Sequence, residues 1–248
     1  PGTGGDPMGA TFGLLTWSTG SATSFFKDDQ ARSLLAGLST AALLRTDRFN
    51  TQIATAMFAN LRLACKGGFG PASSDVADIQ RSGWRAVFDA DMSADKDMYS
   101  PHYQSYIWAV FLWASRQSDF APFHDRAFAA IQHMMGRFPS YWQPTMNGIT
   151  MQRARMLLPL AWLVRTKDTA QSREWLLTIA DGLLARQDRA TGAFREEVSA
   201  EGWGNAAITP NNEDYGTFES PLNQQNTDPV SDLLYTAPFA LLGLHEAA

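Results

Sequence analysis

The connection that runs from about residue 188 to residue 227 gathers carboxylates, amides and aromatic side chains in one place. Paired carboxylates can act as a general acid and a general base, and cleavage of a glycosidic bond uses such a pair at a separation of about 5–9.5 Å. Connections longer than about 12–15 residues are uncommon in compact domains and are often functional. The first choices for acid and base are Glu197, Glu213 and Glu219, and Asp228 is the next choice.

Each of these acids also has a plainer interpretation. A solvated acidic loop accounts for the composition of the segment without any catalysis. Asp228 directly precedes Pro229 at the start of a helical pattern, where an Asp commonly caps the helix. Both interpretations stay open from the residues alone.

Polar and aromatic residues offer groups that can hold a sugar, because amides and hydroxyls bond its hydroxyl groups and aromatic rings cover its apolar faces. Some lie in the same connection, and others lie at the start of a helical pattern after Pro101 or in the stretch "QRARM". The predicted substrate-binding residues are His102, Tyr103, Gln104, Arg153, Trp203, Asn212, Tyr215 and Gln225.

Two of these assignments have structural alternatives. A single His at a helix start often satisfies a local hydrogen bond, which is the alternative for His102. Arg153 and Arg155 point about 200° apart on a helix, so at most one of them is expected to face a given cleft. An Arg there suits a substrate carboxylate, or it braces the fold by pairing with an acid of the connection.

Composition excludes several classes of function. The chain has 248 residues and a net charge of -5, with scattered basic residues, so a nucleic-acid partner is not expected. No run of about 18 apolar residues occurs, so no membrane span is expected. Cys65 is the single cysteine, which rules out an internal disulfide and suits a buried thiol. No metal-binding spacing and no nucleotide fingerprint is present, so neither a metal nor an organic cofactor is predicted.

Both ends of the chain look like interior points of a longer protein. The sequence opens on a loop-like "PGTGGDPMGATFG" without an initiator Met, and it closes inside a helical pattern. We therefore expect residues 1–248 to form a single domain that is a fragment of a longer chain. A periplasmic or secreted location is expected if a signal peptide precedes this piece, and a cytoplasmic one otherwise.

Helical periodicity dominates the sequence and places these residues. Seven helices are predicted, at 28–45, 48–66, 102–117, 121–138, 149–166, 170–187 and 228–247, with an eighth near 75–88. Asp28 or Asp29 is the expected cap of the first, and Asp168 or Thr169 that of the sixth. Pro159 is expected to kink the fifth. Short connections join the helices in pairs, which favours a stacked array or a closed toroid of helical hairpins.

Five stretches together resemble six-hairpin (α/α)6-toroid glycoside hydrolases of bacterial polysaccharide degradation. They are "KDDQARSLLAGLSTAALL", "YSPHYQSYIWAVFLW", "RARMLLPLAWLVRTKDT", "REEV" and "NNEDYGTFESPLNQQNTDPVSDLLYTAPFALLGLHEAA". The resemblance runs from about Thr16 onward, and the last stretch is its most specific part. Seven or eight helices are fewer than the twelve of a full toroid, so the expected fold is all-α, an incomplete (α/α) toroid.

The resemblance implies a glycoside hydrolase whose partner is an oligosaccharide or polysaccharide of bacterial, plant or algal origin. Some relatives act on glycans that contain uronic acids, so the expected substrate class includes such glycans. Two other functions stay open: a polysaccharide lyase with a His or Tyr base, and a glycan-binding helical-repeat domain without catalysis. Exposed apolar helix faces at the open end of a toroid favour self-association into a homo-oligomer.

Overall fold

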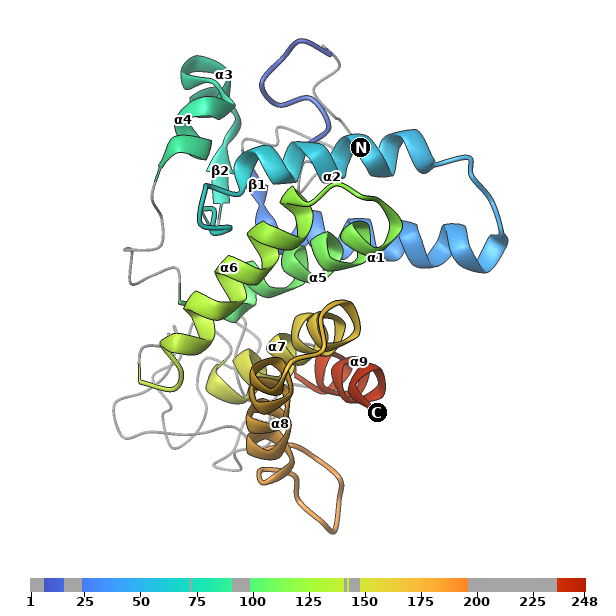
Figure 1. The fold of residues 1–248 in the computed structure, drawn as a ribbon, viewed down its shortest axis with the longest axis vertical. Coiled ribbons are helices and arrows are strands. Elements are labelled where there is room, and N and C mark those ends of the chain that lie inside the picture. Colours follow the sequence, from blue (N-terminus) through green and yellow to red (C-terminus); the bar gives the residue numbers. More distant parts are fainter. Residues whose placement is uncertain are drawn as a thin grey trace, which may run out of the picture. The chain divides into compact units, whose positions relative to one another are not determined.

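The computed structural model describes residues 7–15, 24–71, 73–90, 99–140, 142, 148–195 and 236–248. Helices dominate these residues and strands are short, which confirms the all-α class (Figure 1). The elements are β1 (Ser24–Phe26), α1 (Lys27–Leu44), α2 (Asn50–Leu63), β2 (Ser73–Asp75), α3 (Val76–Ser82), α4 (Trp84–Asp89), α5 (Pro101–Gln117), α6 (Pro122–Gly136), α7 (Gly148–Thr166), α8 (Ala170–Leu184) and α9 (Ala237–Ala247). No described helix is both long enough and apolar enough to cross a membrane.

The chain divides into two compact units by its internal contacts. Unit 1 comprises residues 1–98 and 106–133, and unit 2 comprises residues 99–105 and 134–248. Helices α5 and α6 therefore each contribute residues to both units. The single domain and the toroid stay predictions.

Unit 1 is built around helices α1 and α2, which pack together as the predicted pair (Figure 1). Its strands β1 and β2 pair antiparallel, with Phe25 opposite Ser74. One apolar core cluster brings residues from β1, α2, α3 and the turn before β1 together: Leu14, Phe25, Ala59, Leu63 and Ile79. The region of the expected eighth helix therefore contributes Ile79 to the core.

Helix α5 is buried on every side in unit 1. The seven residues from Tyr106 to Leu112 are each at most 3% exposed, as expected for a helix that is apolar nearly all round. Trp108 donates a hydrogen bond from Nε1 to the Gly68 carbonyl oxygen at 3.0 Å. Phe111 packs against Phe123 of α6 with ring centroids 5.5 Å apart. Cys65 is fully buried, which confirms its predicted environment.

The predicted cap of α1 is wrong. The helix begins at Lys27 after an extended Phe26, whose side chain makes no capping hydrogen bond. Asp28 and Asp29 lie inside the first turn, where both form ion pairs with Arg32. Strand β1 runs directly into the helix, so its last residue occupies the cap position.

The expected eighth helix is divided in two. Helices α3 and α4 meet at Gly83, which has a φ of 74° and closes the first helix by donating its N–H to the Ile79 carbonyl oxygen. Asp75 caps α3 by accepting the Asp78 backbone N–H at 3.1 Å.

Unit 2 consists largely of α7, α8 and α9. Helix α7 packs against both of the others, and α7 with α8 forms the predicted pair (Figure 1). The α9 contact is close, because a Cβ on Gly243 would collide with Leu157 of α7. Helix α7 continues through Pro159. Thr169 caps α8, as predicted, and forms a reciprocal capping box with Ser172.

Candidate functional site

The strongest candidate site among the described residues is a buried polar cluster in unit 2, at the first turn of α5 and the first two turns of α7. Six of its side chains are at most 7% exposed. We call these residues the polar cluster: Ser100, His102, Gln104, Gln152, Arg153 and Arg155. Buried polar groups are costly unless they are hydrogen-bonded, so such a concentration requires a structural or functional reason.

Gln152 joins the two helices through both ends of its amide. Its Oε1 accepts the backbone N–H of His102 at 2.6 Å, and its Nε2 donates to Ser100 Oγ at 3.0 Å. The first N–H groups of a helix lack partners within the helix, and Pro101 ahead of His102 has no N–H. Gln152 therefore caps the start of α5 from another helix.

The two arginines of α7 lie on opposite faces of the helix, and both are buried. Arg155 donates from Nη1 to the His102 carbonyl oxygen at 2.9 Å, and its guanidinium lies 4.1 Å from the Phe239 ring of α9. Arg153 lies against Gly182 of α8, where an added Cβ would be 3.4 Å from its Nε. The two side chains thus have different neighbours, Arg153 against α8 and Arg155 against α9.

Tyr103 lies at the edge of the polar cluster. Its ring centroid is 4.4 Å from that of His102, with 60° between the ring planes. Tyr103 is partly exposed, whereas His102 is 3% exposed. The phenol and the imidazole are therefore adjacent, and the phenol is the more accessible of the two.

The chain enters segment 196–235 from beside the first turn of α7. Thr150 donates from Oγ1 to the Arg195 carbonyl oxygen at 2.9 Å. The preceding turn is held by Asp188, whose carboxylate accepts the backbone N–H groups of Ala190 and Thr191 at 3.0 Å and a guanidinium N–H of Arg195 at 3.1 Å. Hydrogen bonds to Thr191, Arg195 and Ala190 lower the pKa of Asp188 to about 2.

The structure brings together only part of the predicted site. His102, Gln104 and Arg153 lie in the polar cluster, and Tyr103 lies beside it. The other predicted residues fall outside the described residues: Glu197, Trp203, Asn212, Glu213, Tyr215, Glu219, Gln225 and Asp228. The predicted start of the last helix, at residue 228, also falls outside them.

Three members of the polar cluster were not among the predicted site residues: Ser100, Gln152 and Arg155. Gln152 and Arg155 are three residues apart, so they share one face of α7, and both bond the backbone of His102. That spacing was available from the sequence. The sequence did not show that Gln152 and Arg155 face α5, because the start of α5 lies about fifty residues away in the chain.

The polar cluster supplies donors and cations. Guanidinium groups bind carboxylates, while amides and hydroxyls bond sugar hydroxyl groups. The polar cluster itself contains no Asp or Glu, so a two-carboxylate reaction needs acids from elsewhere in the chain. Among the described residues, no group of three or more His, Cys, Asp or Glu is placed to hold a metal ion.

Comparison with known proteins gives no relative. No model of a protein family matches the chain, and neither curated proteins nor solved structures include a match.

Proposed function

We propose that this chain is a glycoside hydrolase that acts on an oligosaccharide containing uronic acid, using a two-carboxylate mechanism on an incomplete (α/α) toroid. The observation that supports this proposal most is that the stretches "YSPHYQ" and "QRAR" contact each other in the polar cluster. These stretches belong to the resemblance, they lie about fifty residues apart, and Gln152 and Arg155 bond the backbone of His102. Arg153 of this cluster suits an acidic sugar, because a guanidinium group can bind a carboxylate.

In this proposal the acids come from segment 196–235. One carboxylic acid protonates the glycosidic oxygen as the bond to the leaving sugar breaks. The other carboxylate attacks the anomeric carbon or takes a proton from the attacking water, according to their separation. The proposed acid and base are two of Glu197, Glu213 and Glu219. Asp228 is the next candidate. His102, Tyr103, Gln104 and Arg153 position the sugar.

The test is turnover of a panel of aryl glycosides and aryl uronides by the purified chain. The variants are Glu197→Gln, Glu213→Gln and Glu219→Gln, each replacing a carboxylate by an amide of similar shape. Loss of an acid–base residue lowers kcat by about 10²- to 10⁴-fold. Glu174→Gln is the matched control, because Glu174 is exposed on α8. Circular dichroism checks that each variant keeps its helices.

Three results would count against the proposal. Full turnover in all three variants would show that none of the three glutamates is the catalytic acid or base. An unsaturated product that absorbs in the ultraviolet would assign the chain to the lyases instead. Binding of oligouronides without turnover would favour the non-catalytic glycan-binding alternative.

A further inference from the structure

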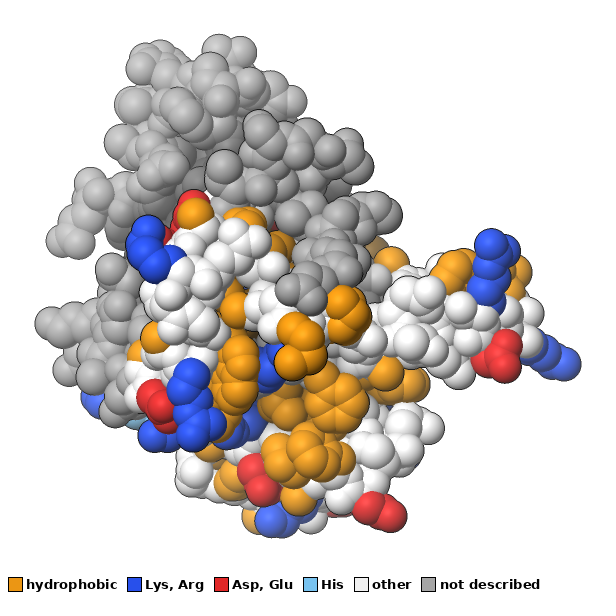
Figure 2. All heavy atoms as spheres, turned by 90° about the horizontal axis from the view of Figure 1, so that it is seen from above, with side chains coloured by type: hydrophobic (Ala, Val, Ile, Leu, Met, Phe, Trp, Pro, Cys, Tyr) orange, Lys and Arg blue, Asp and Glu red, His pale blue; other side chains and the backbone are white. Residues whose placement is uncertain are grey.

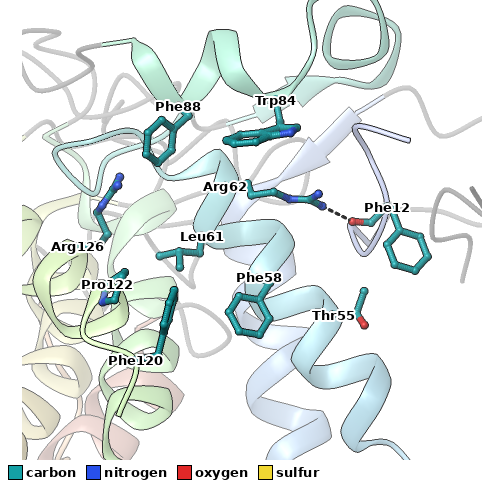
Figure 3. A pocket seen from close by; sticks show the side chains of 10 residues that line it. All are labelled: Phe12, Thr55, Phe58, Leu61, Arg62, Trp84, Phe88, Phe120, Pro122 and Arg126. Atoms are coloured by element: carbon teal, nitrogen blue, oxygen red, sulfur yellow. Dashed lines mark hydrogen bonds between the residues drawn. The ribbon is translucent and has the colours of Figure 1, made fainter. Parts of the chain in front are cut away.

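Unit 1 contains a pocket that the proposed hydrolase reaction does not use. Its volume is about 540 Å³, within the range of about 300–1,000 Å³ that is usual for small-molecule sites. Figure 3 shows the ten side chains that line it: Phe12, Thr55, Phe58, Leu61, Arg62, Trp84, Phe88, Phe120, Pro122 and Arg126. We call this site the aromatic pocket.

Four segments form the walls, one of which is the N-terminal turn that carries Phe12. Helix α2 presents Thr55, Phe58, Leu61 and Arg62, whose spacing places them on one face. Helix α4 packs against α2 and adds Trp84 and Phe88, four residues apart. The turn before α6 and its first turns add Phe120, Pro122 and Arg126.

The rings hold one another in place. Phe58 and Phe120 meet edge to face with centroids 5.6 Å apart, and Trp84 and Phe88 do so at 5.8 Å. Phe58 and Phe120 are 48% and 42% exposed, so apolar rings remain accessible at the pocket. Figure 2 shows hydrophobic side chains gathered in the middle of one face of the molecule, with basic side chains beside them.

The charged residues that line the aromatic pocket in the described part of the chain are both arginines. Arg62 donates from Nη2 to the Phe12 carbonyl oxygen at 2.7 Å (Figure 3), and its Nε is buried without a hydrogen-bond partner among the described residues. Arg126 donates from Nη1 to the Cys65 carbonyl oxygen at 2.6 Å, and its guanidinium lies 4.6 Å from the Phe88 ring.

Neither arginine pairs with a carboxylate of the described residues. Within those ranges, no ion pair involves Arg62 or Arg126, and no Asp or Glu lines the aromatic pocket. Asp125 adjoins Arg126 in the chain, but its side chain is 71% exposed and contacts His124. Burial lowers the pKa of both arginines. Their positive charge is thus only partly solvated, and neither forms an ion pair with a carboxylate of the described residues, although Cys65 and Asp125 oppose the lowering of the Arg126 pKa. Such a charge favours a bound anion.

The rest of the lining argues against a sugar as the ligand. The Thr55 hydroxyl already donates to the Thr51 carbonyl oxygen at 2.7 Å, and the remaining side chains are apolar. A sugar would leave most of its hydroxyl groups without partners there, at a cost for each one. A ligand with an apolar ring that packs against the aromatic side chains and one anionic group that binds the Arg62 guanidinium matches both the apolar lining and the unpaired positive charge.

We propose that the aromatic pocket binds a small aromatic carboxylate. The ring packs among Phe58, Trp84 and Phe120, and the carboxylate accepts an N–H group of Arg62, which lies on the same side of the pocket as Trp84 and Phe58 (Figure 3). This site lies wholly within unit 1, so it stands or falls independently of the hydrolase proposal for unit 2.

The test compares 3-phenylpropanoate with its neutral amide, 3-phenylpropanamide, by isothermal titration calorimetry on the full chain. Because charge-assisted hydrogen bonds are roughly twice as strong as neutral ones, the acid is expected to bind at least about tenfold more tightly. Saturation-transfer NMR should show the aromatic protons of the acid in contact with the protein. Equal affinity for acid and amide, or no saturable binding of the acid, would overturn the proposal without any variant being needed.

Variants then test which arginine binds the carboxylate of the ligand. Arg62→Gln is expected to weaken binding of the acid at least about tenfold and to leave binding of the amide unchanged. Arg126→Gln is expected to have a smaller effect, because the Arg126 guanidinium donates to the Cys65 carbonyl oxygen and lies over the Phe88 ring. Arg81→Gln is the control, because Arg81 is exposed on α3 away from the lining residues. Unchanged affinity for the acid in the folded Arg62→Gln variant would also overturn the assignment.

Discussion

Gln152 on α7 accepts the backbone N–H of His102 at 2.6 Å and so supplies the capping bond at the start of α5. Capping side chains usually come from the residue just before a helix. Here the acceptor comes from a residue fifty positions away, and the same amide donates to Ser100. The start of α5 and the first two turns of α7 thus form one hydrogen-bonded unit.

Gln152→Leu is expected to lower the free energy of unfolding by about 1–3 kcal/mol, because it leaves the buried His102 N–H and Ser100 hydroxyl without this partner. Urea unfolding measures the loss, and hydrogen exchange should show faster exchange of the His102 amide. Gln171→Leu on the exposed face of α8 is the matched control and should stay within about 0.5 kcal/mol of the parent. Equal effects of the two changes would show that the amide has no special role.

Apolar spacing was sufficient to predict the helices and two of their pairings. Helices α1, α2, α5, α6, α7 and α8 each begin and end within a few residues of the expected bounds. The cap of α8 at Thr169 was also predictable, because a capping box is local. These features depend on residues near one another in the chain.

Features that depend on distant partners were not predictable. The predicted cap of α1 was wrong because Phe26 belongs to a strand that pairs with residues 73–75. Arg155 was left out of the predicted site because sequence alone did not reveal that α9 covers its face of α7. The aromatic pocket combines residues from the first turn, α2, α4 and α6, and no single stretch of the chain indicates it.

Lys27 makes the stability of the protein depend on pH in the alkaline range. Burial lowers the pKa of Lys27 from 10.5 to about 8, with Cys65 raising it by a smaller amount, and Nζ donates to the Leu63 carbonyl oxygen at 3.3 Å. Between pH 8 and 10.5 the unfolded chain binds more protons at this group than the folded chain. The free energy of unfolding should therefore rise with pH across that window, by up to about 3 kcal/mol.

Lys27→Met should abolish that rise and stabilise the protein below pH 8, where burial of the charged lysine is most costly. The loss of the donor to Leu63 offsets part of the gain. Urea unfolding from pH 7 to pH 10 measures both effects, and Lys66→Met at an exposed, paired lysine is the control. Parallel pH curves for the parent and Lys27→Met would contradict the lowered pKa.

Thr169 stabilises the start of α8. Its Oγ1 accepts the Ser172 N–H at 3.0 Å, while Ser172 Oγ accepts the Thr169 N–H at 3.0 Å. Thr169→Ala should lower the free energy of unfolding of this part of the chain by about 1 kcal/mol. Thr178→Ala, at an exposed position inside the same helix, should raise it slightly because Ala has the higher helix propensity. The same sign for both changes would argue against the cap.

Gly68 is required where the chain passes closest to α6. Its φ is 83°, and a Cβ there would collide with the Arg126 carbonyl oxygen and lie 2.8 Å from the Ala130 Cβ. Its own carbonyl oxygen accepts the Trp108 indole N–H, so the backbone cannot move away without loss of that bond. Gly68→Ala should therefore lower the free energy of unfolding by about 2–4 kcal/mol, through combined backbone strain and overpacking.

Gly136→Ala provides the opposite expectation at the end of α6. Apart from the backbone of α6 itself, no atom of the described residues lies within 4 Å of an added Cβ there, and Gly136 does not have a positive φ. A helical Gly without such constraints is neutral or gains up to about 1 kcal/mol on replacement by Ala. Thermal and urea unfolding of both variants should therefore shift in opposite directions or leave Gly136→Ala unchanged. A loss of similar size in both would mean that the close approach of Gly68 to Arg126 and Ala130 is not what constrains the position.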